Sequence, residues 1–178
     1  MKLKLYIAAM SASVLLTACQ QMQTSKPAAA AAPAAASASA AEIVIDNGDP
    51  GFKSQGNWAT AGGGHDHKDS ATYASSTSAG DAANTATWTP DIRSAGLYDV
   101  YEWHGDDPNS DHASNAPFTV KSEDGTKTIM VNLRNNTGKW NLLGTFNFAA
   151  GKADYVSVSS RNADGNVLAD AVRFFPHP

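Results

Sequence analysis

The feature that most restricts the fold is a series of short β-type segments between residues 42 and 178. Apolar residues at helical spacing are missing there, whereas runs of β-branched and aromatic residues recur between Gly, Asn, Asp and Pro. We expect strands at residues 42–46, 84–89, 96–103, 117–122, 126–133, 139–148, 154–160 and 167–175. Such spacing predicts an all-β domain, an antiparallel β-sandwich of about eight strands with jelly-roll architecture.

Alternation within a segment predicts which side chains face the core. In residues 139–148, Leu142, Phe146 and Phe148 fall on one face, with Gly144 between them. Because successive side chains of a strand point to opposite faces, we predict that these three residues point inward together.

Asp170 conflicts with its neighbours in the last segment, because it shares a face with Val172 and Phe174. A carboxylate buried on that face needs partners. The preferred interpretation is structural hydrogen bonding. The alternative is a calcium ion, for which Asp46 and Asp49 would add oxygen ligands if the first and last strands lie side by side. The segment from Asp46 to Asp49 also suits a plain turn.

The residues before the domain predict export and lipidation. Lys2 and Lys4 precede an apolar run that is too short to span a bilayer and is typical of a secretory signal. The run ends in LTAC at residues 16–19, which resembles a bacterial lipobox and implies removal of residues 1–18 and acylation of Cys19. Since Cys19 is the only cysteine, an internal disulfide and a cysteine-based zinc site are excluded.

Residues 19–41 are dominated by Ala, Pro and Ser, with Pro27 and Pro33 interrupting the alanine tract. We interpret them as a tether. By the sorting rule of bacterial lipoproteins, Gln20 implies a lipid-anchored protein of the outer membrane in a two-membrane bacterium. In a one-membrane host, the protein would be anchored at the cell surface.

Charge and motif content narrow the function classes. The chain has a net charge of −4 and no cluster of Lys and Arg, which argues against nucleic-acid binding and against a second, electrostatic contact with a membrane. The sequence has no Gly-x-Ser-x-Gly motif, no catalytic cysteine in the domain and no distinguished pair of carboxylates. We therefore predict that the protein is not an enzyme.

Two segments concentrate groups that bind divalent transition metals. The first lies between Trp103 and Phe118 and contains His104, His112, Asp106, Asp107 and Asp111. No regular spacing holds them on one face, so a solvated end loop is the preferred interpretation and a metal site the alternative. The second segment places His65 and His67 after three glycines. If the two loops meet, the four histidines would form a joint site.

Seven segments form an ordered series: IVIDNGDPGF (43–52), GNW (56–58), ATWTPDI (86–92), GLYDVYEW (96–103), NAPFTV (115–120), GKWNLLGTFNF (138–148) and LADAVRFF (168–175). This series resembles the golvesin C-terminal and xanthan lyase carbohydrate-binding-like domain family over essentially the whole domain. The resemblance implies a galactose-binding-like β-sandwich module that is often appended to secreted enzymes acting on polysaccharides or other envelope substrates, with carbohydrate binding as its role.

For this chain we expect a surface-anchored, non-catalytic module for an envelope polysaccharide or a peptidoglycan-like ligand. The alternative is a structural or adhesive lipoprotein that binds a protein partner. Aromatic rings stack on sugars and amides bind hydroxyl groups, so the candidate contacts are Trp103, Tyr73, Trp58, Asn115 and Asn109. Trp88 and Trp140 lie within family-like strands and are predicted to be core residues.

Overall fold

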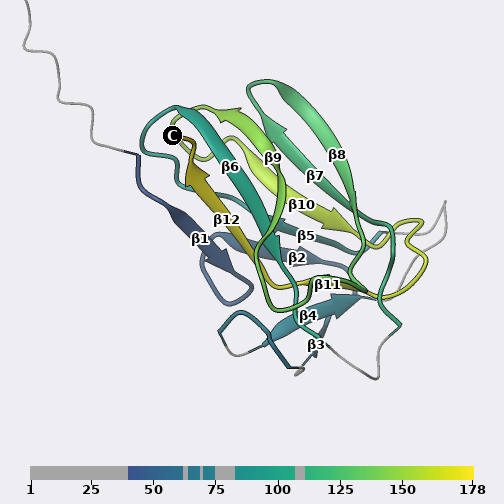
Figure 1. Ribbon diagram of the computed structural model, residues 1–178. Helices are drawn as coiled ribbons and strands as arrows, with labels where there is room; N and C mark the ends of the chain where they lie inside the picture. Colours follow the sequence, from purple (N-terminus) through teal and green to yellow (C-terminus); the bar gives the residue numbers. More distant parts are fainter. Residues whose placement is uncertain (1–39, 62–63, 69, 75–82, 107–110) are drawn as a thin grey trace, which may run out of the picture. The chain divides into compact units, whose positions relative to one another are not determined.

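The structure, a computed structural model, describes residues 40–61, 64–68, 70–74, 83–106 and 111–178 (Figure 1). The predicted signal peptide, Cys19 and nearly all of the predicted tether lie outside the described residues, as do Asp107 and Asn109. In the described part of the chain, no helix has the length and apolar character needed to cross a membrane.

The described residues form antiparallel sheets, which confirms the predicted all-β sandwich. Sheet A has the order β1 (Ile43–Asp46), β12 (Ala171–Pro176), β6 (Gly96–Trp103) and β9 (Asn141–Phe148). Sheet B has the order β2 (Phe52–Gln55), β5 (Thr85–Trp88), β10 (Tyr155–Ser159), β7 (Ala116–Ser122) and β8 (Gly125–Val131). Sheet C, at one end of the sandwich in Figure 1, has the order β11 (Val167–Ala169), β4 (Ala71–Ala74) and β3 (Ala59–Ala61).

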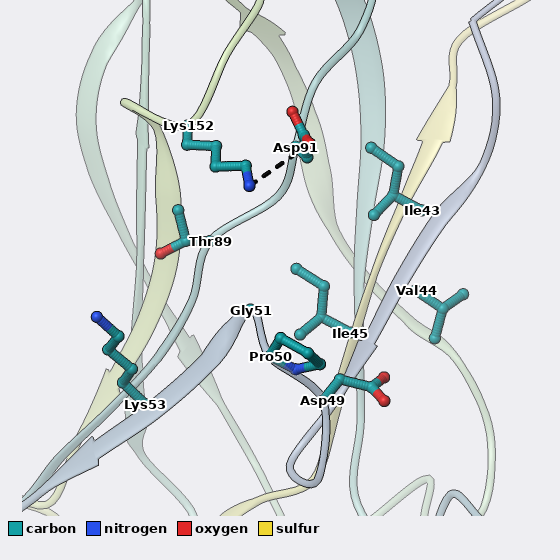
Figure 2. Close-up of a pocket in the computed structure, with 10 residues that line it drawn as sticks. All are labelled: Ile43, Val44, Ile45, Asp49, Pro50, Gly51, Lys53, Thr89, Asp91 and Lys152. Carbon is teal, nitrogen blue, oxygen red and sulfur yellow. Dashed lines mark ion pairs between the residues drawn. The ribbon is translucent and has the colours of Figure 1, made fainter.

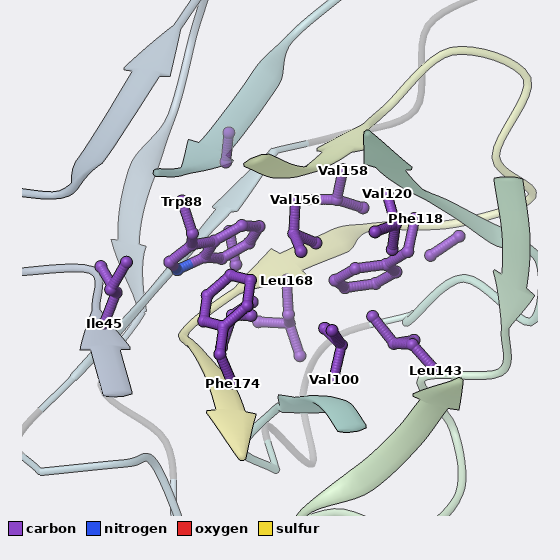
Figure 3. Packing of buried hydrophobic residues seen from close by; sticks show 14 of the residues in the cluster. Ile45, Trp88, Val100, Phe118, Val120, Leu143, Val156, Val158, Leu168 and Phe174 are labelled. Atoms are coloured by element: carbon purple, nitrogen blue, oxygen red, sulfur yellow. The ribbon is translucent and has the colours of Figure 1, made fainter. Parts of the chain in front are cut away.

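The core forms because strands of both large sheets alternate buried and partly exposed residues. In β7 every second residue from Ala116 to Ser122 is buried, and in β10 Val156 and Val158 are buried. Large rings fill the space between the sheets (Figure 3): Trp88 stacks on Phe118 with centroids 6.2 Å apart. This packing confirms Trp88 as a core residue.

The inward face predicted for β9 is wrong at Leu142. The register between β6 and β9 shifts at a β-bulge, where Val100 pairs with Gly144 but the next residue, Tyr101, pairs with Leu142. The extra residue, Leu143, takes the buried position, while Leu142 is 58% exposed. A bulge reverses the alternation on one side of itself, and this is why Phe146 and Phe148 are buried as predicted but Leu142 is not.

The structure has twelve strands in its described residues, against about eight predicted. Strands β2, β3 and β4 were not predicted, because their segments are short and contain few β-branched or large apolar residues. The segment predicted at 167–175 is two strands, β11 and β12, separated at Asp170. Asp170 is 1% exposed, so the predicted burial of this carboxyl group is confirmed.

A large-to-small substitution at the centre of the core tests this packing. Phe148 is fully buried and packs edge-on against Tyr98 and Phe174. We expect Phe148→Ala to lower the free energy of unfolding by about 3–5 kcal/mol, because it removes buried area and leaves a cavity. Urea denaturation measures this change. Leu97→Ala, at a residue that is 51% exposed, is the matched control and should cost far less; equal losses would contradict the packing described.

Candidate functional site

The outer face of sheet A carries a group of half-exposed aromatic residues. Arg173 of β12 pairs with Tyr101 of β6, which in turn pairs with Leu142 of β9. Directly opposed residues of neighbouring strands point to the same face. Since the alternate residues of β6 and β12 are buried, these side chains lie on the outside of the sandwich. We call the face formed around Arg173 the aromatic platform; its rings are Tyr101, Trp103, Trp140 and Phe175.

Arg173 holds the platform together from its centre. Its guanidinium carbon lies 4.6 Å from the ring centroid of Phe175, 5.3 Å from that of Tyr101 and 5.8 Å from that of Trp140. Its Nε also lies 2.7 Å from a carboxylate oxygen of Glu42. Cation–π attraction and this ion pair orient the guanidinium group, so the rings surround a fixed planar group instead of a mobile side chain.

At one end of the platform, His67 packs against both tryptophans. The rings of Trp103 and Trp140 meet edge to face with centroids 5.3 Å apart, and the His67 ring lies 5.6 Å from the first and 5.2 Å from the second. Ala171 lies between Asp46 and Trp103 in the register of sheet A. Its small side chain leaves room above the sheet for the imidazole, which contacts residues on either side of it.

The two histidine-containing loops meet, as the joint-site alternative requires. Gly64 and Asp106 exchange two backbone hydrogen bonds of 2.9 and 2.7 Å, and Trp103 Nε1 donates to the carbonyl oxygen of His65. Gly138 approaches from a third segment with φ of +67°, and a Cβ there would lie 2.7 Å from the Cβ of His65. This position therefore requires glycine for both its conformation and its space.

Two buried carboxyl groups hold His67 in place. Its Nδ1 lies 2.6 Å from Asp46 Oδ2, and its backbone N–H donates to Asp170 Oδ2 at 2.9 Å. Asp170 Oδ1 is buried without a hydrogen-bond partner. Burial raises the pKa of Asp170 to about 8, with smaller contributions from the negative charges of Asp46, Asp66 and Glu102, although the hydrogen bond from the His67 N–H opposes this rise. At neutral pH Asp170 is therefore mostly protonated.

The prediction of a solvated loop is wrong for His104. This residue is 1% exposed, and its Nδ1 lies 2.9 Å from Glu102 Oε2, which is itself fully buried. Its Nε2 lies 3.0 Å from the carbonyl oxygen of Asn135. Both ring nitrogens therefore face oxygen atoms of the protein. The pair connects the core to the turn that precedes β9.

The prediction is also wrong for His112, which is 5% exposed. Its Nδ1 lies 3.2 Å from the Leu133 carbonyl oxygen, and the His112 backbone forms an isolated β-bridge with Asn166. Asp111 is exposed and lies 3.6 Å from Arg134, while Asp106 pairs with Gly64 through its backbone. Within the described ranges, no three His, Cys, Asp or Glu side chains are grouped to hold a metal ion. A metal site on these loops stays a prediction of the sequence.

The segment from Asp46 to Asp49 forms a turn next to the last strand. Strands β1 and β12 pair, which confirms that the first and last strands lie side by side. The N–H of Asp49 donates to the carbonyl oxygen of Asp46, and the N–H of Asp46 donates to Asp49 Oδ2. Lys68 Nζ lies 3.0 Å from the same oxygen of Asp49. These carboxylates thus have protein partners, as the turn interpretation predicts.

The predicted sugar contacts are spread over the molecule. Trp103 belongs to the platform, whereas Trp58 and Tyr73 pack partly against the core. The side chain of Asn115 joins two loops, since its Nδ2 donates to the Asn162 carbonyl oxygen and its Oδ1 accepts from the Asp164 N–H. The core prediction for Trp140 is wrong, because this residue is half-exposed on the outer face.

Sequence reasoning missed Tyr101, Arg173 and Phe175. Alternation contained the signal for them, because each lies one residue from a buried strand position: Val100, Val172 and Phe174. Aromatic residues at outward positions of two neighbouring strands predict an exposed aromatic face. Finding that face also requires the strand order, which the sequence alone did not provide.

A separate hollow of about 510 Å³ lies between the edge strands β1 and β2 (Figure 2). Ile43, Ile45 and Pro50 form much of its apolar lining, and an ion pair between Asp91 and Lys152 lies at its rim with an N–O distance of 3.5 Å. It has no aromatic ring in its lining. It is therefore less suited to stacking on a sugar than the platform is.

The raised pKa of Asp170 predicts a pH dependence of stability. The folded state holds a proton on this carboxyl group up to about pH 8, whereas the unfolded chain loses it near the ordinary value of 3.8. Stability contributed by this group is therefore complete at low pH and is lost as pH rises from about 4 to about 8, by on the order of a few kcal/mol. Asp170→Asn removes the ionisation and should flatten this part of the curve.

Urea denaturation of both proteins at intervals from pH 5 to pH 9 checks this expectation, with the difference between their unfolding free energies as the readout. The native chain should lose stability relative to the variant as pH rises. Parallel curves would contradict the assigned protonation of Asp170.

Comparison with known proteins agrees with this architecture. Residues 43–176 match the Golvesin C-terminal domain. The xanthan lyase of Bacillus sp. (strain GL1) is 32% identical over 136 residues, which cover 74% of this chain but only 14% of that protein. The solved structure of Paenibacillus xanthan lyase matches with a TM-score of 0.70 and 31% identity, over 77% of this chain and 13% of that one. The chain belongs to the Golvesin C-terminal domain family.

Proposed function

We propose that this domain binds a polysaccharide without chemical turnover, and that the aromatic platform is its binding surface. The observation that carries the proposal is the set of half-exposed rings, Tyr101, Trp103, Trp140 and Phe175, arranged around Arg173 on one sheet face. The apolar faces of sugar rings stack on aromatic side chains, and polar groups beside the rings bind the hydroxyl groups.

The geometry suits an extended chain better than a small enclosed ligand. The rings come from two neighbouring strands of sheet A, β6 and β12, and from the turn before β9, so they form a surface and not a closed pocket. The Glu42 carboxylate and the guanidinium group of Arg173 provide acceptors and donors within that surface. The family relationship supports the ligand class, since the two relatives are named as xanthan lyases and this chain matches a small part of each.

The surroundings of the platform also favour binding over hydrolysis. Hydrolysis of a glycosidic bond generally requires two carboxyl groups on either side of the bond. Asp46 and Asp170 are buried and contact His67, out of reach of a chain lying on the platform. Asp99, farther along the face, lies 2.6 Å from Thr145 Oγ1 and 3.0 Å from His177 Nδ1.

We further propose that the domain is held at a bacterial membrane surface by acyl chains on Cys19. The lipobox-like residues 16–19 support this proposal, as does the Ala/Pro/Ser-rich segment that precedes the domain. Several buried acyl chains provide firm attachment, whereas one chain alone is marginal. A binding module anchored in this way would hold an envelope polysaccharide near the membrane.

Substitutions at Tyr101 test the platform. We expect Tyr101→Ala to weaken binding to an envelope polysaccharide preparation by on the order of tenfold, because it removes a stacking ring. Tyr101→Phe keeps the ring and should bind nearly as the native chain does. Tyr155→Ala is the matched control, since Tyr155 is a half-exposed tyrosine on β10 of the other sheet. Affinity electrophoresis in gels containing the polysaccharide measures the binding.

Each variant is first checked for an unchanged thermal unfolding midpoint. If Tyr101→Ala and Tyr155→Ala weaken binding equally, or if neither does, the platform is not the binding surface.

Substitution of the proposed lipidation site tests the anchor. The full chain, expressed in a bacterium, should partition into the detergent phase of a Triton X-114 separation, and Cys19→Ser should move it to the aqueous phase because acylation is lost. Gln21→Ser, two residues further on, is a control that should leave partitioning unchanged. Aqueous partitioning of the unsubstituted chain would contradict the anchor.

A further inference from the structure

Beside the platform, a hollow of about 230 Å³ lies between β8 and β9, which are the edge strands of sheets B and A. Its apolar lining comes from Ile129, Met130 and Val131 of β8 and from Leu142 and Leu143 of β9, and four asparagines also line it. These amides belong to Asn132, Asn135, Asn136 and Asn141, and we call this site the amide hollow. It is smaller than the pockets that enclose whole drug-sized ligands, so it suits one substituent or one unit of a longer chain.

The apolar side of the amide hollow is exposed to solvent. Met130 is 65% exposed and Leu142 is 58% exposed, and among the described residues only Leu97 is a comparably exposed large hydrophobic residue. Met130 and Leu142 come from different sheets, yet both line the same hollow. Met130 pairs with Pro117 on the outer face of sheet B and Leu142 pairs with Tyr101 on the outer face of sheet A, so these two side chains flank the hollow on opposite sides. Ile129, Val131 and Leu143 also line the hollow and give it an apolar surface for an apolar group of a ligand.

The polar side of the hollow is held in place by the protein. Asn141 Nδ2 donates to the carbonyl oxygens of Asn136 and Lys139, and Asn132 Oδ1 accepts from the Arg134 N–H. The buried His104 ring contacts the Asn135 carbonyl oxygen from below. The turn that carries the asparagines is therefore fixed before a ligand arrives, which reduces the entropy lost on binding.

These bonds leave several amide groups available. Asn132 Nδ2, Asn141 Oδ1 and the whole side-chain amide of Asn135 make no hydrogen bond with the part of the chain that the structure describes. The hollow thus offers both donors and acceptors next to its apolar lining. No Asp, Glu, Lys or Arg lines it, and the nitrogens of His104 already face protein oxygens. This chemistry favours a neutral group over a carboxylate.

We propose that the amide hollow binds the acetamido group of an N-acetylated hexosamine in the polysaccharide. An acetamido group combines a methyl group with an N–H donor and a carbonyl acceptor, and it carries no charge. The methyl group would contact Ile129, Val131 and Leu143 of the lining, while the amide would bond with the asparagine side chains. A hydroxyl substituent lacks the methyl group, and a uronate would carry a charge with no cation in the lining.

The position of the hollow supports this assignment. Leu142 lines the hollow and also pairs with Tyr101 of the platform. Trp140 directly precedes Asn141 in the chain. A glycan lying across the platform would therefore place a ring substituent in the hollow. The inference rests on the proposed function and specifies its ligand as an amino-sugar polymer.

A pair of matched oligosaccharides tests the inference. Each is titrated into the full chain, which contains residues 40–178, and binding is measured by isothermal titration calorimetry. Chitotetraose and cellotetraose share a β-1,4-linked backbone and differ by an acetamido group in place of a hydroxyl group. We expect chitotetraose to bind about tenfold more tightly. Asn135→Ala and Val131→Thr should each reduce this preference several-fold while leaving the affinity for cellotetraose unchanged. Thr126→Ala, at an exposed position on β8, is the control.

The outcomes separate the two proposals. Equal affinities for both oligosaccharides, each weakened by Tyr101→Ala, would overturn the acetamido assignment and keep the platform. A chitotetraose preference that survives both variants would also overturn the assignment to the amide hollow. Failure of both oligosaccharides to bind, with binding of an envelope polysaccharide intact, would exclude an N-acetylated hexosamine as the ligand and leave the proposed function standing.

Discussion

The contact between His67 and two buried carboxyl groups determines how one end of the aromatic platform is built. Asp46 and Asp170 are both buried, and His67 supplies a ring nitrogen to the first and a backbone N–H to the second. Protonation of Asp170 reduces the remaining repulsion, because it removes a negative charge near Asp46 and Glu102. Once His67 is fixed, its ring supports Trp103 and Trp140, and through them one end of the platform.

The platform and the amide hollow share their structural origin, which is the bulge between β6 and β9. Without the extra residue Leu143, Leu142 would point inward and could not lie beside Tyr101 on the outer face. Leu142 then contributes to both sites, since it pairs with Tyr101 and lines the hollow. Bulges often re-aim side chains next to functional sites, and this one would join the two surfaces into a single path for an extended glycan.

The sequence predicts the fold better than the site, and the reasons are physical. Strands such as β6 and β10 have regular alternation and turn residues at both ends, so their type and approximate bounds can be predicted. Alternation does not reveal an inserted residue, which explains the error at Leu142. Nor does it reveal long-range partners: His104 sits in a segment rich in polar residues, yet Glu102 and the Asn135 carbonyl oxygen allow it to be buried.

The buried polar groups have a further consequence for specificity. The Glu102–His104 pair lies at the end of β6, and the His104 carbonyl oxygen also accepts from the N–H of Gly138. One residue thus holds the turn before β9 at two points, Asn135 and Gly138. That turn carries the asparagines of the amide hollow and leads to Trp140. Polar groups in the core thus fix the turn that carries both the ring of Trp140 and the amide groups, as the proposed binding of a regularly repeating glycan would require.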